Sequence, residues 1–132
     1  MVCAGLIFGF ASLGILHSNN LNDLEIDHQR GARTIANQIG FKRSQKYFSF
    51  IYFSILAVGV VAALLGGVPA WFSLAPGVAG IKVLQMVNRV KQASGPLSPA
   101  INMIRFEAAQ VHLLMGAGYL VILFLAEAIR RF

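Results

Sequence analysis

The longest uncharged stretch of the chain is "YFSFIYFSILAVGVVAALLGGVPAWFSLAPGVAGI", residues 47–81. A helix needs about 20 apolar residues to cross a bilayer, so this stretch is long enough for two such helices. The sequence Gly-Gly-Val-Pro at 66–69 interrupts it near its middle, where one helix can end and another begin. The stretch therefore predicts two membrane spans, over Tyr47–Leu65 and Ala70–Val90.

Two further uncharged stretches, residues 1–22 and 108–126, lie on either side of this central one. They predict spans over Val2–His17 and Gln110–Ile129. The composition agrees, because 57% of the residues are hydrophobic and only 12% are charged, which is outside the range of soluble domains. We expect an all-α fold, an integral membrane helical bundle with about four transmembrane helices.

The basic residues of the chain lie at the ends of the predicted spans. The formal net charge is +6, but these residues do not gather on one soluble face, so membrane topology explains the charge better than a nucleic-acid partner. Five of them fall between the first two spans, namely Arg30, Arg33, Lys42, Arg43 and Lys46. A short loop rich in Lys and Arg marks the cytoplasmic side of a membrane. We therefore expect this loop to face the cytoplasm of a multi-pass protein.

The same loop contains "NNLNDLEIDHQRGARTIANQIG", residues 19–40, with three of the chain's five acidic residues. If its first half is helical, Asp23 and Asp27 share one face and Glu25 points away. Residues that would lie on or near the face of the two aspartates are Asn19, Asn20 and Arg30. Two carboxylates at this spacing repel each other, so a cation is expected to compensate them.

Magnesium fits this arrangement because it prefers oxygen ligands and is commonly held by one or two carboxylates together with substrate phosphates. Arg30 and Arg33 would then suit the outer oxygens of a diphosphate. Gly31, between them, permits close backbone approach or ends the helix. The alternative is a solvated loop whose mixed charges serve only solubility and topology, and the spacing leaves both interpretations open.

The third predicted span carries a polar stripe on one helical face, formed by Lys82, Gln85, Arg89 and Gln92. An ionisable residue inside a span is a candidate functional residue, which here is Lys82. Alternatively, Lys82 extends its ammonium to the interface and Arg89 only marks the cytoplasmic end. After a loop at 91–99, residues 100–110 predict a short interfacial helix before the last span.

Residues 19–40 closely resemble the second aspartate-rich motif of the UbiA superfamily of intramembrane prenyltransferases. The most similar form is that of the 1,4-dihydroxy-2-naphthoate prenyltransferase branch, approximately N-N-x-R-D-x-x-x-D-x-x-x-G-K-x-T-L-A-x-x-L-G. The matching residues are Asn19, Asn20, Asp23, Asp27, Gly31, Thr34, Ala36 and Gly40. Asn22 and Ala32 stand where the branch has Arg and Lys, and Glu107 replaces a basic residue. Residues 108–125 are similar to the last helix of the branch.

The resemblance implies a magnesium-dependent reaction. Magnesium held between two aspartate-rich loops draws the diphosphate off an allylic isoprenoid, and an aromatic ring captures the carbocation. Asp23 and Asp27 would be the metal ligands and catalytic residues. Residues expected to bind the prenyl diphosphate or support the geometry are Asn19, Asn20, Arg30, Arg33 and Lys82. The acceptor would be 1,4-dihydroxy-2-naphthoate, in menaquinone or phylloquinone synthesis.

The family's other aspartate-rich motif, of the N-D-x-x-D-x-x-x-D kind, is not present in the sequence. Residues 1–132 are therefore expected to form a partial prenyltransferase domain, corresponding to the C-terminal part of the bundle, which needs a separate N-terminal half. The alternative is a non-catalytic membrane fragment or helical subunit that retains a cation-binding loop.

Overall fold

The computed structural model describes residues 2–65 and 74–131, and this part of the chain folds into helices without strands. Four long helices form the body of the molecule: α1 (Val2–Asn22), α4 (Phe41–Leu64), α5 (Leu74–Gln92) and α7 (Ile104–Arg131). Three short helices connect them: α2 (Leu24–Gln29), α3 (Ile35–Ile39) and α6 (Pro99–Asn102). The predicted all-α bundle is confirmed.

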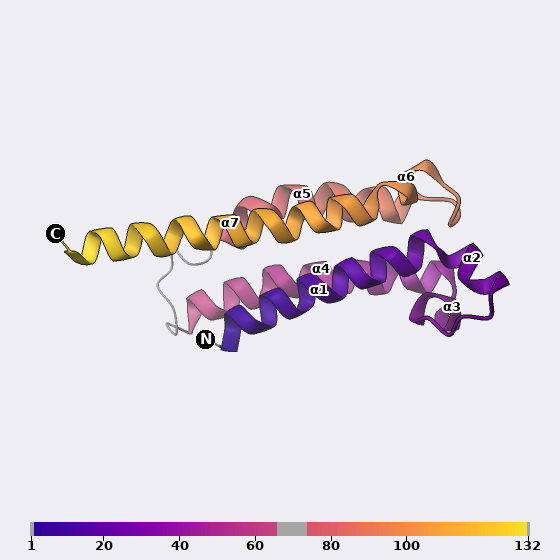
Figure 1. Ribbon diagram of the computed structural model, residues 1–132, viewed down its shortest axis with the longest axis horizontal. Coiled ribbons are helices and arrows are strands. Elements are labelled where there is room, and N and C mark those ends of the chain that lie inside the picture. Colours follow the sequence, from indigo (N-terminus) through magenta and orange to yellow (C-terminus); the bar gives the residue numbers. More distant parts are fainter. Residues whose placement is uncertain (1, 66–73, 132) are drawn as a thin grey trace.

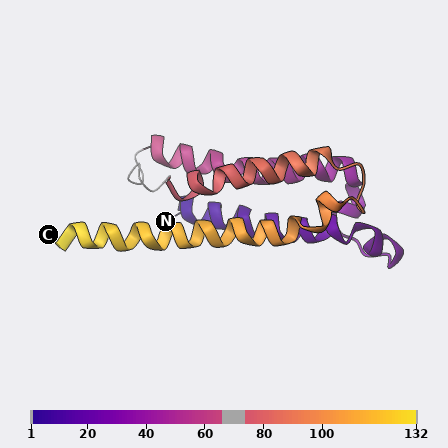
Figure 2. The same ribbon diagram turned by 90° about the horizontal axis from the view of Figure 1, so that it is seen from above.

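The long helices run alternately up and down the bundle (Figure 1). Helices α1 and α4 lie side by side in one layer, and α5 and α7 in the other, as α1–α4 and α5–α7 contacts indicate. The layers also contact each other through α1 and α7 and through α4 and α5. The short helices lie at one end of the bundle and the chain termini at the other, with α7 extending past its neighbours (Figure 2). The aspartate-rich segment therefore lies at the end opposite the termini.

The core consists of apolar side chains from all four long helices. Its largest fully buried members include Ile7, Leu21, Phe48, Tyr52, Met86, Ile104 and Met115. Gly14 lets α1 approach α4 closely, because a Cβ at this position would lie 2.7 Å from the Tyr52 hydroxyl oxygen. Small residues serve the same purpose at helix contacts in membrane proteins generally. In the α1–α4 pair, which presents the aspartate-rich segment, the Tyr52 side chain thus packs against the backbone of α1 at Gly14.

The helix ends differ from the sequence-based prediction. Helix α1 continues past His17 to Asn22, and α4 begins at Phe41 rather than at Tyr47. The separate helix expected over 100–110 is wrong, because only α6 is separate and the rest belongs to α7. Apolar windows end where charges begin, whereas helical hydrogen bonding continues into polar sequence. The predicted interruption at 66–69 and the start of the third span lie outside the described residues.

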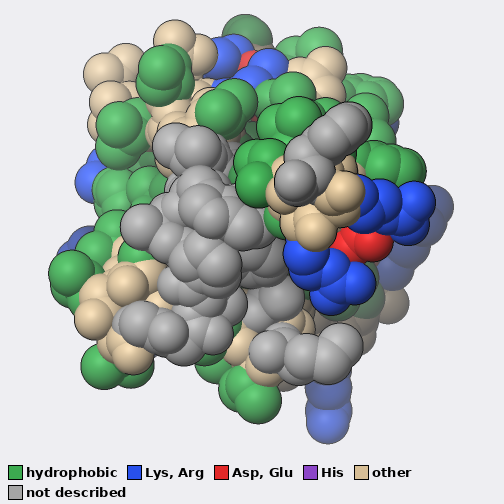
Figure 3. All heavy atoms as spheres, turned by 90° about the vertical axis from the view of Figure 1, so that its left-hand side faces the viewer, with side chains coloured by type: hydrophobic (Ala, Val, Ile, Leu, Met, Phe, Trp, Pro, Cys, Tyr) green, Lys and Arg blue, Asp and Glu red, His purple; other side chains and the backbone are tan. Residues whose placement is uncertain are grey.

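The outer surface of the bundle is rich in apolar side chains. Within the described residues, two helical segments are long and apolar enough to cross a membrane, Phe41–Leu64 and Pro99–Arg131. Large exposed apolar side chains include Leu64, Leu113, Leu120 and Phe124. Hydrophobic side chains also occupy much of the bundle end that carries the termini (Figure 3). Extended apolar surface of this kind suits a lipid environment, and the molecule is a membrane-embedded helical bundle.

Candidate functional site

Asp23 lies at the junction between α1 and α2 and is the N-cap residue of α2, with φ of −98° and ψ of 8°. The Asp23 amide donates to the Asn19 carbonyl at 2.9 Å, and the Asp27 amide donates to the Asp23 carbonyl at 2.8 Å. Both bonds have the i to i−4 spacing of an α-helix, which brings the Cβ atoms of such residues to about 5–6 Å. Asp23 and Asp27 are therefore one turn apart in the chain, but across the junction of two helices rather than within the single helix that was expected.

Gly31 ends α2 through its left-handed backbone conformation, with φ of 68°. The Gly31 amide donates to the His28 carbonyl at 3.1 Å, and the Ala32 amide donates to the Asp27 carbonyl at 2.9 Å. These two bonds form a Schellman motif, in which glycine is favoured because a Cβ would strain the left-handed residue. Of the two roles considered for Gly31, ending the helix is the one this geometry supports.

Three further motif residues also shape the backbone. The Thr34 side chain caps α3 by accepting from the Asn37 amide at 3.3 Å. Gly40 has φ of 76° and ψ of 164°, a conformation that suits glycine, where α3 turns into α4. Ala36 is fully buried beneath this turn. The motif residues without such a backbone role are the half-buried polar ones, Asn19, Asn20, Asp23 and Asp27.

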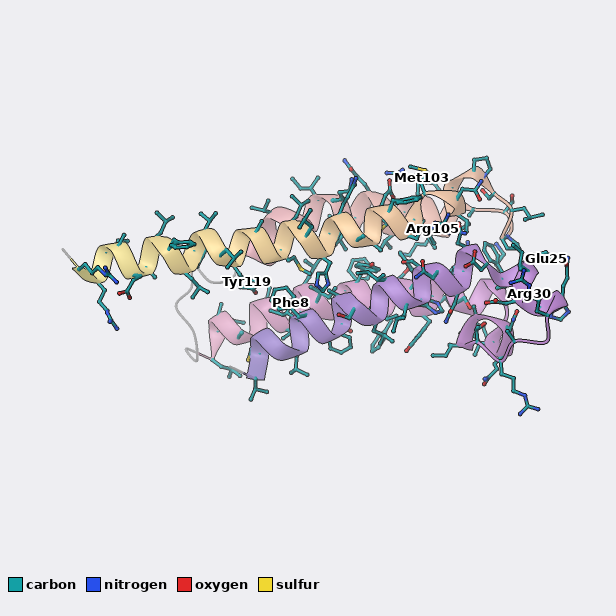
Figure 4. The ribbon with its side chains drawn as sticks, in the orientation of Figure 1. Phe8, Glu25, Arg30, Met103, Arg105 and Tyr119 are labelled. Carbon is teal, nitrogen blue, oxygen red and sulfur yellow. The ribbon has the colours of Figure 1, made fainter. Side chains whose placement is uncertain are left out.

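The carboxylates of the motif are not compensated by basic side chains. Within residues 2–65 and 74–131, no ion pair includes Asp23, Glu25 or Asp27. In the part of the chain that the structure describes, the one side-chain hydrogen bond to these carboxylates comes from the Asn22 amide nitrogen, 2.9 Å from Asp23 Oδ1. Arg30 and Arg33 are exposed at the same end of the bundle, where Figure 4 shows Arg30 near the tip. The site thus offers free anionic groups with free cations close by in the chain.

The donor set fits magnesium in kind, although the chain supplies only part of a coordination shell. Asp23 and Asp27 offer carboxylate oxygens, and Asn19 and Asn20 offer amide oxygens, which are the hard ligands that this ion prefers. Among the described residues, no three His, Cys, Asp or Glu side chains converge on one point. A metal held here would take its remaining ligands from water, from a phosphate or from another polypeptide.

A shallow cleft of about 530 Å³ lies beside the motif and is lined by Glu25 and by the loop from Ser94 to Pro99. Glu25 itself is exposed, and Figure 4 shows it at the same end of the bundle as Arg30. Glu25 and the loop between α5 and α6 thus border the same open hollow. This placement of Glu25 is consistent with the expectation that Glu25 does not join the two aspartates.

His17 and Ser44 fix the position of the motif relative to α4. His17 is 1% exposed, and its Nε2 lies 3.1 Å from the Ser44 carbonyl oxygen. The His17 ring also packs edge-on against Tyr47, with centroids 4.8 Å apart. The other ring nitrogen, Nδ1, is buried without a hydrogen-bond partner. The position of His17, two residues before the motif, is visible in the sequence, but its partner Ser44 is not.

The structure does not bring Lys82 to the motif. Lys82 is half-buried and lies ten residues before the end of α5, which is roughly 15 Å along the helix axis. The other members of the polar stripe, Gln85, Arg89 and Gln92, are exposed. Within this bundle the stripe therefore faces outward rather than into the core.

Arg89 and Glu107 form an ion pair that the sequence did not reveal. Arg89 Nη1 lies 2.6 Å from Glu107 Oε1, and the pair joins α5 to α7 near the motif end. Glu107 is 8% exposed, whereas the Arg89 side chain is 48% exposed. The interpretation of Arg89 as a topological marker is therefore incomplete, since this residue also compensates a buried carboxylate.

These features define a membrane-embedded helical bundle with an aspartate-rich helical turn at one end. The family profile described as "UbiA prenyltransferase family" matches residues 1–104 of this chain. The chain therefore belongs to the UbiA prenyltransferase family, whose substrates are a prenyl diphosphate and an aromatic compound. No curated protein and no solved structure matches the chain.

Proposed function

We propose that this chain contributes the second aspartate-rich motif to a magnesium-dependent prenyl transfer, from a prenyl diphosphate to an aromatic acceptor. The proposed acceptor is 1,4-dihydroxy-2-naphthoate, because residues 19–40 resemble the motif of that branch most closely. The observation that carries the proposal is the pair of carboxylates of Asp23 and Asp27, which are joined by one i to i−4 backbone hydrogen bond and have no basic partner in the described residues.

Some residues of the site would bind the metal and others would bind the substrate. Asp23 and Asp27 would hold the ion, with Asn19 and Asn20 at the preceding helical turn completing the polar surface. Arg30 and Arg33, exposed beyond the helix end, would bind the outer diphosphate oxygens. When bound, magnesium would supply positive charge where negative charge develops on the leaving diphosphate.

The membrane location follows from the substrate, because an isoprenoid tail is itself a lipid. The motif lies at one end of α1, so a diphosphate could bind at the membrane surface while the tail extends along the helices. The proposed orientation places this end on the cytoplasmic side, where a short loop rich in Lys and Arg belongs. A closed bundle would also keep water from the carbocation.

The proposed activity requires a second polypeptide segment. The other aspartate-rich motif is not found in the sequence, and the carboxylates present make only part of a metal site. A second candidate function follows from the same observation, namely a non-catalytic membrane subunit that retains a cation-binding turn.

The experiment that separates the two candidates is prenyl transfer to 1,4-dihydroxy-2-naphthoate in liposomes, with and without magnesium. The chain is assayed alone and then together with the N-terminal half of a related enzyme, after insertion of both pieces has been verified. Turnover that appears only with the added half and with magnesium supports the proposal. The absence of turnover in both assays supports the non-catalytic subunit.

A further inference from the structure

A basic groove lies between α4 and α5 and is separate from the aspartate-rich motif. It has a volume of about 730 Å³ and is lined by Lys42, Gln45, Lys46, Ser49, Phe50, Phe53 and Lys91. The three lysines are exposed, and no ion pair in the described part of the chain includes any of them. The groove therefore concentrates three uncompensated positive charges in one concavity.

The depth of the groove in the membrane follows from the length of α4. This helix has 24 residues, which corresponds to about 36 Å, whereas the hydrocarbon core of a bilayer is about 30 Å thick. Roughly one helical turn must therefore extend beyond the core. Lys42 lies in the first turn of α4, Lys46 one turn further in, and Lys91 in the last turn of α5, so the long side chains of all three can reach the lipid headgroups.

The groove is basic near the start of α4 and apolar further along this helix. Phe50 is 62% exposed and Phe53 is 39% exposed, both further into α4 than the lysines. The Lys91 ammonium lies over the Phe53 ring, 5.5 Å from its centroid, which holds this charge at the groove wall. A groove with lysines at one end and aromatic side chains further along suits an amphipathic ligand better than a free ion.

Hydrogen bonds between α4 and α5 hold the walls of the groove in place. The buried Gln45 side chain donates to the carbonyl oxygens of Val90 and Ala93, which ties α4 to the end of α5. The N-terminus of α4 and the C-terminus of α5 adjoin here, so their helix dipoles offset each other. The net positive charge of the groove therefore comes from its lysines.

We propose that this groove binds the phosphate headgroup of an anionic phospholipid such as phosphatidylglycerol. Basic pockets between membrane helices bind anionic headgroups in this way, with each nearby Lys or Arg contributing about fivefold in affinity. The acyl chains of the lipid would continue along Phe50 and Phe53 into the bilayer. This inference does not depend on the proposed prenyl transfer, because it uses none of the motif residues.

The test is a titration of the chain in detergent with dioleoyl-phosphatidylglycerol, dioleoyl-phosphatidylcholine or soluble glycerol 3-phosphate, with bound ligand counted by native mass spectrometry. We expect phosphatidylglycerol to bind at least about fivefold more tightly than phosphatidylcholine. Equal affinity for the two lipids overturns the proposal. Binding of glycerol 3-phosphate as tight as that of the lipid also overturns it, because the apolar part of the groove would then contribute nothing.

Three matched variants assign the binding to the groove. The variant K42Q/K46Q/K91Q should lose about 100-fold in affinity for phosphatidylglycerol, and K42R/K46R/K91R should stay within about threefold of the unsubstituted chain. Arg43→Gln removes a charge from the same helix outside the groove and should change the affinity by less than about twofold. An unchanged affinity in the glutamine triple variant contradicts the assignment, and retained binding in the arginine variant verifies that the groove still forms.

Discussion

The acidic residues of α7 and those of the aspartate-rich motif differ in how their charges are compensated. Glu107 pairs with Arg89 at 2.6 Å, and Glu127 pairs with Arg130 and Arg131. The three acids between Asp23 and Asp27 have no ion pair in the described residues, although Arg30 follows closely in the chain. The carboxylates of α7 are thus paired, whereas those of the motif are unpaired within the part of the chain that the structure describes.

For Glu107, the energetic reason for pairing is burial. Glu107 is 8% exposed, and a buried charge without a partner is strongly destabilising. Asp23 and Asp27 are half-buried, so water solvates them and their mutual repulsion is only a few tenths of a kcal/mol. The motif can therefore keep free carboxylates at small cost to stability.

The largest expected effect is the loss of turnover when a motif carboxylate is neutralised. In an assembled, active enzyme, Asp23→Asn or Asp27→Asn should lower kcat/KM by about 100-fold or more, because charge is lost where the leaving diphosphate is stabilised. The matched control is Glu25→Gln, which removes the same charge from the exposed neighbour and should stay within about twofold. The measurement is magnesium-dependent prenyl transfer. Equal losses of kcat/KM in all three variants would show that the two aspartates do not differ from Glu25.

The next effect concerns the pair between α5 and α7. Arg89→Ala should lower the free energy of unfolding by about 3 kcal/mol, because it leaves Glu107 buried and charged without its partner. Glu107→Gln should cost only about 1 kcal/mol, since the Arg89 side chain is 48% exposed and water can solvate it. Unfolding in detergent by a chemical denaturant measures both values. Equal costs would show that the burial of Glu107 does not govern this interaction.

A smaller effect is expected at the C-terminal end of α7. Glu127 pairs with Arg131 at 3.0 Å and with Arg130 at 3.6 Å, but all three side chains are largely solvent-accessible. Glu127→Gln should therefore change the free energy of unfolding by less than about 1 kcal/mol. The same unfolding experiment applies, and a cost similar to that of Arg89→Ala would mean that pairing alone, rather than burial, determines stability.

The smallest expected effect is a change of opposite sign in the free energy of unfolding, which would distinguish the motif aspartates from the paired acids. Asp27→Asn should raise the free energy of unfolding slightly, by about 0.2–0.5 kcal/mol, because it removes the repulsion from Asp23. The measurement is made without magnesium, so that no bound ion offsets the repulsion. A loss of stability on this substitution would assign Asp27 to the fold and contradict its role as a free ligand.

Much of the architecture could be predicted because each long helix is formed by one continuous stretch of sequence. Four uncharged or nearly uncharged stretches predicted the four long helices. Ending a helix was one of the two roles considered for Gly31, and its left-handed conformation just after α2 fits that role. Features decided by neighbouring residues in the chain were thus accessible to prediction.

The features that escaped prediction depend on contacts between helices. The Arg89–Glu107 pair joins α5 to α7, and the His17–Ser44 hydrogen bond joins α1 to α4. The basic groove likewise takes Lys46 from α4 and Lys91 from α5. Periodicity within one helix shows which face a residue occupies, but not which residue of another helix faces it. The helix ends were missed because backbone hydrogen bonding extends beyond the apolar windows.

The most direct test of the central claim is to count the metal held by the two aspartates. Mn²⁺ can replace magnesium in oxygen-rich sites, and its electron paramagnetic resonance signal distinguishes bound from free ion. The assembled protein is titrated with Mn²⁺ in the presence of a prenyl diphosphate, as the unsubstituted chain, as D23N/D27N and as the control Glu25→Gln. The account predicts binding to the unsubstituted chain and to the control, and its loss in D23N/D27N. Undiminished binding in D23N/D27N would contradict it.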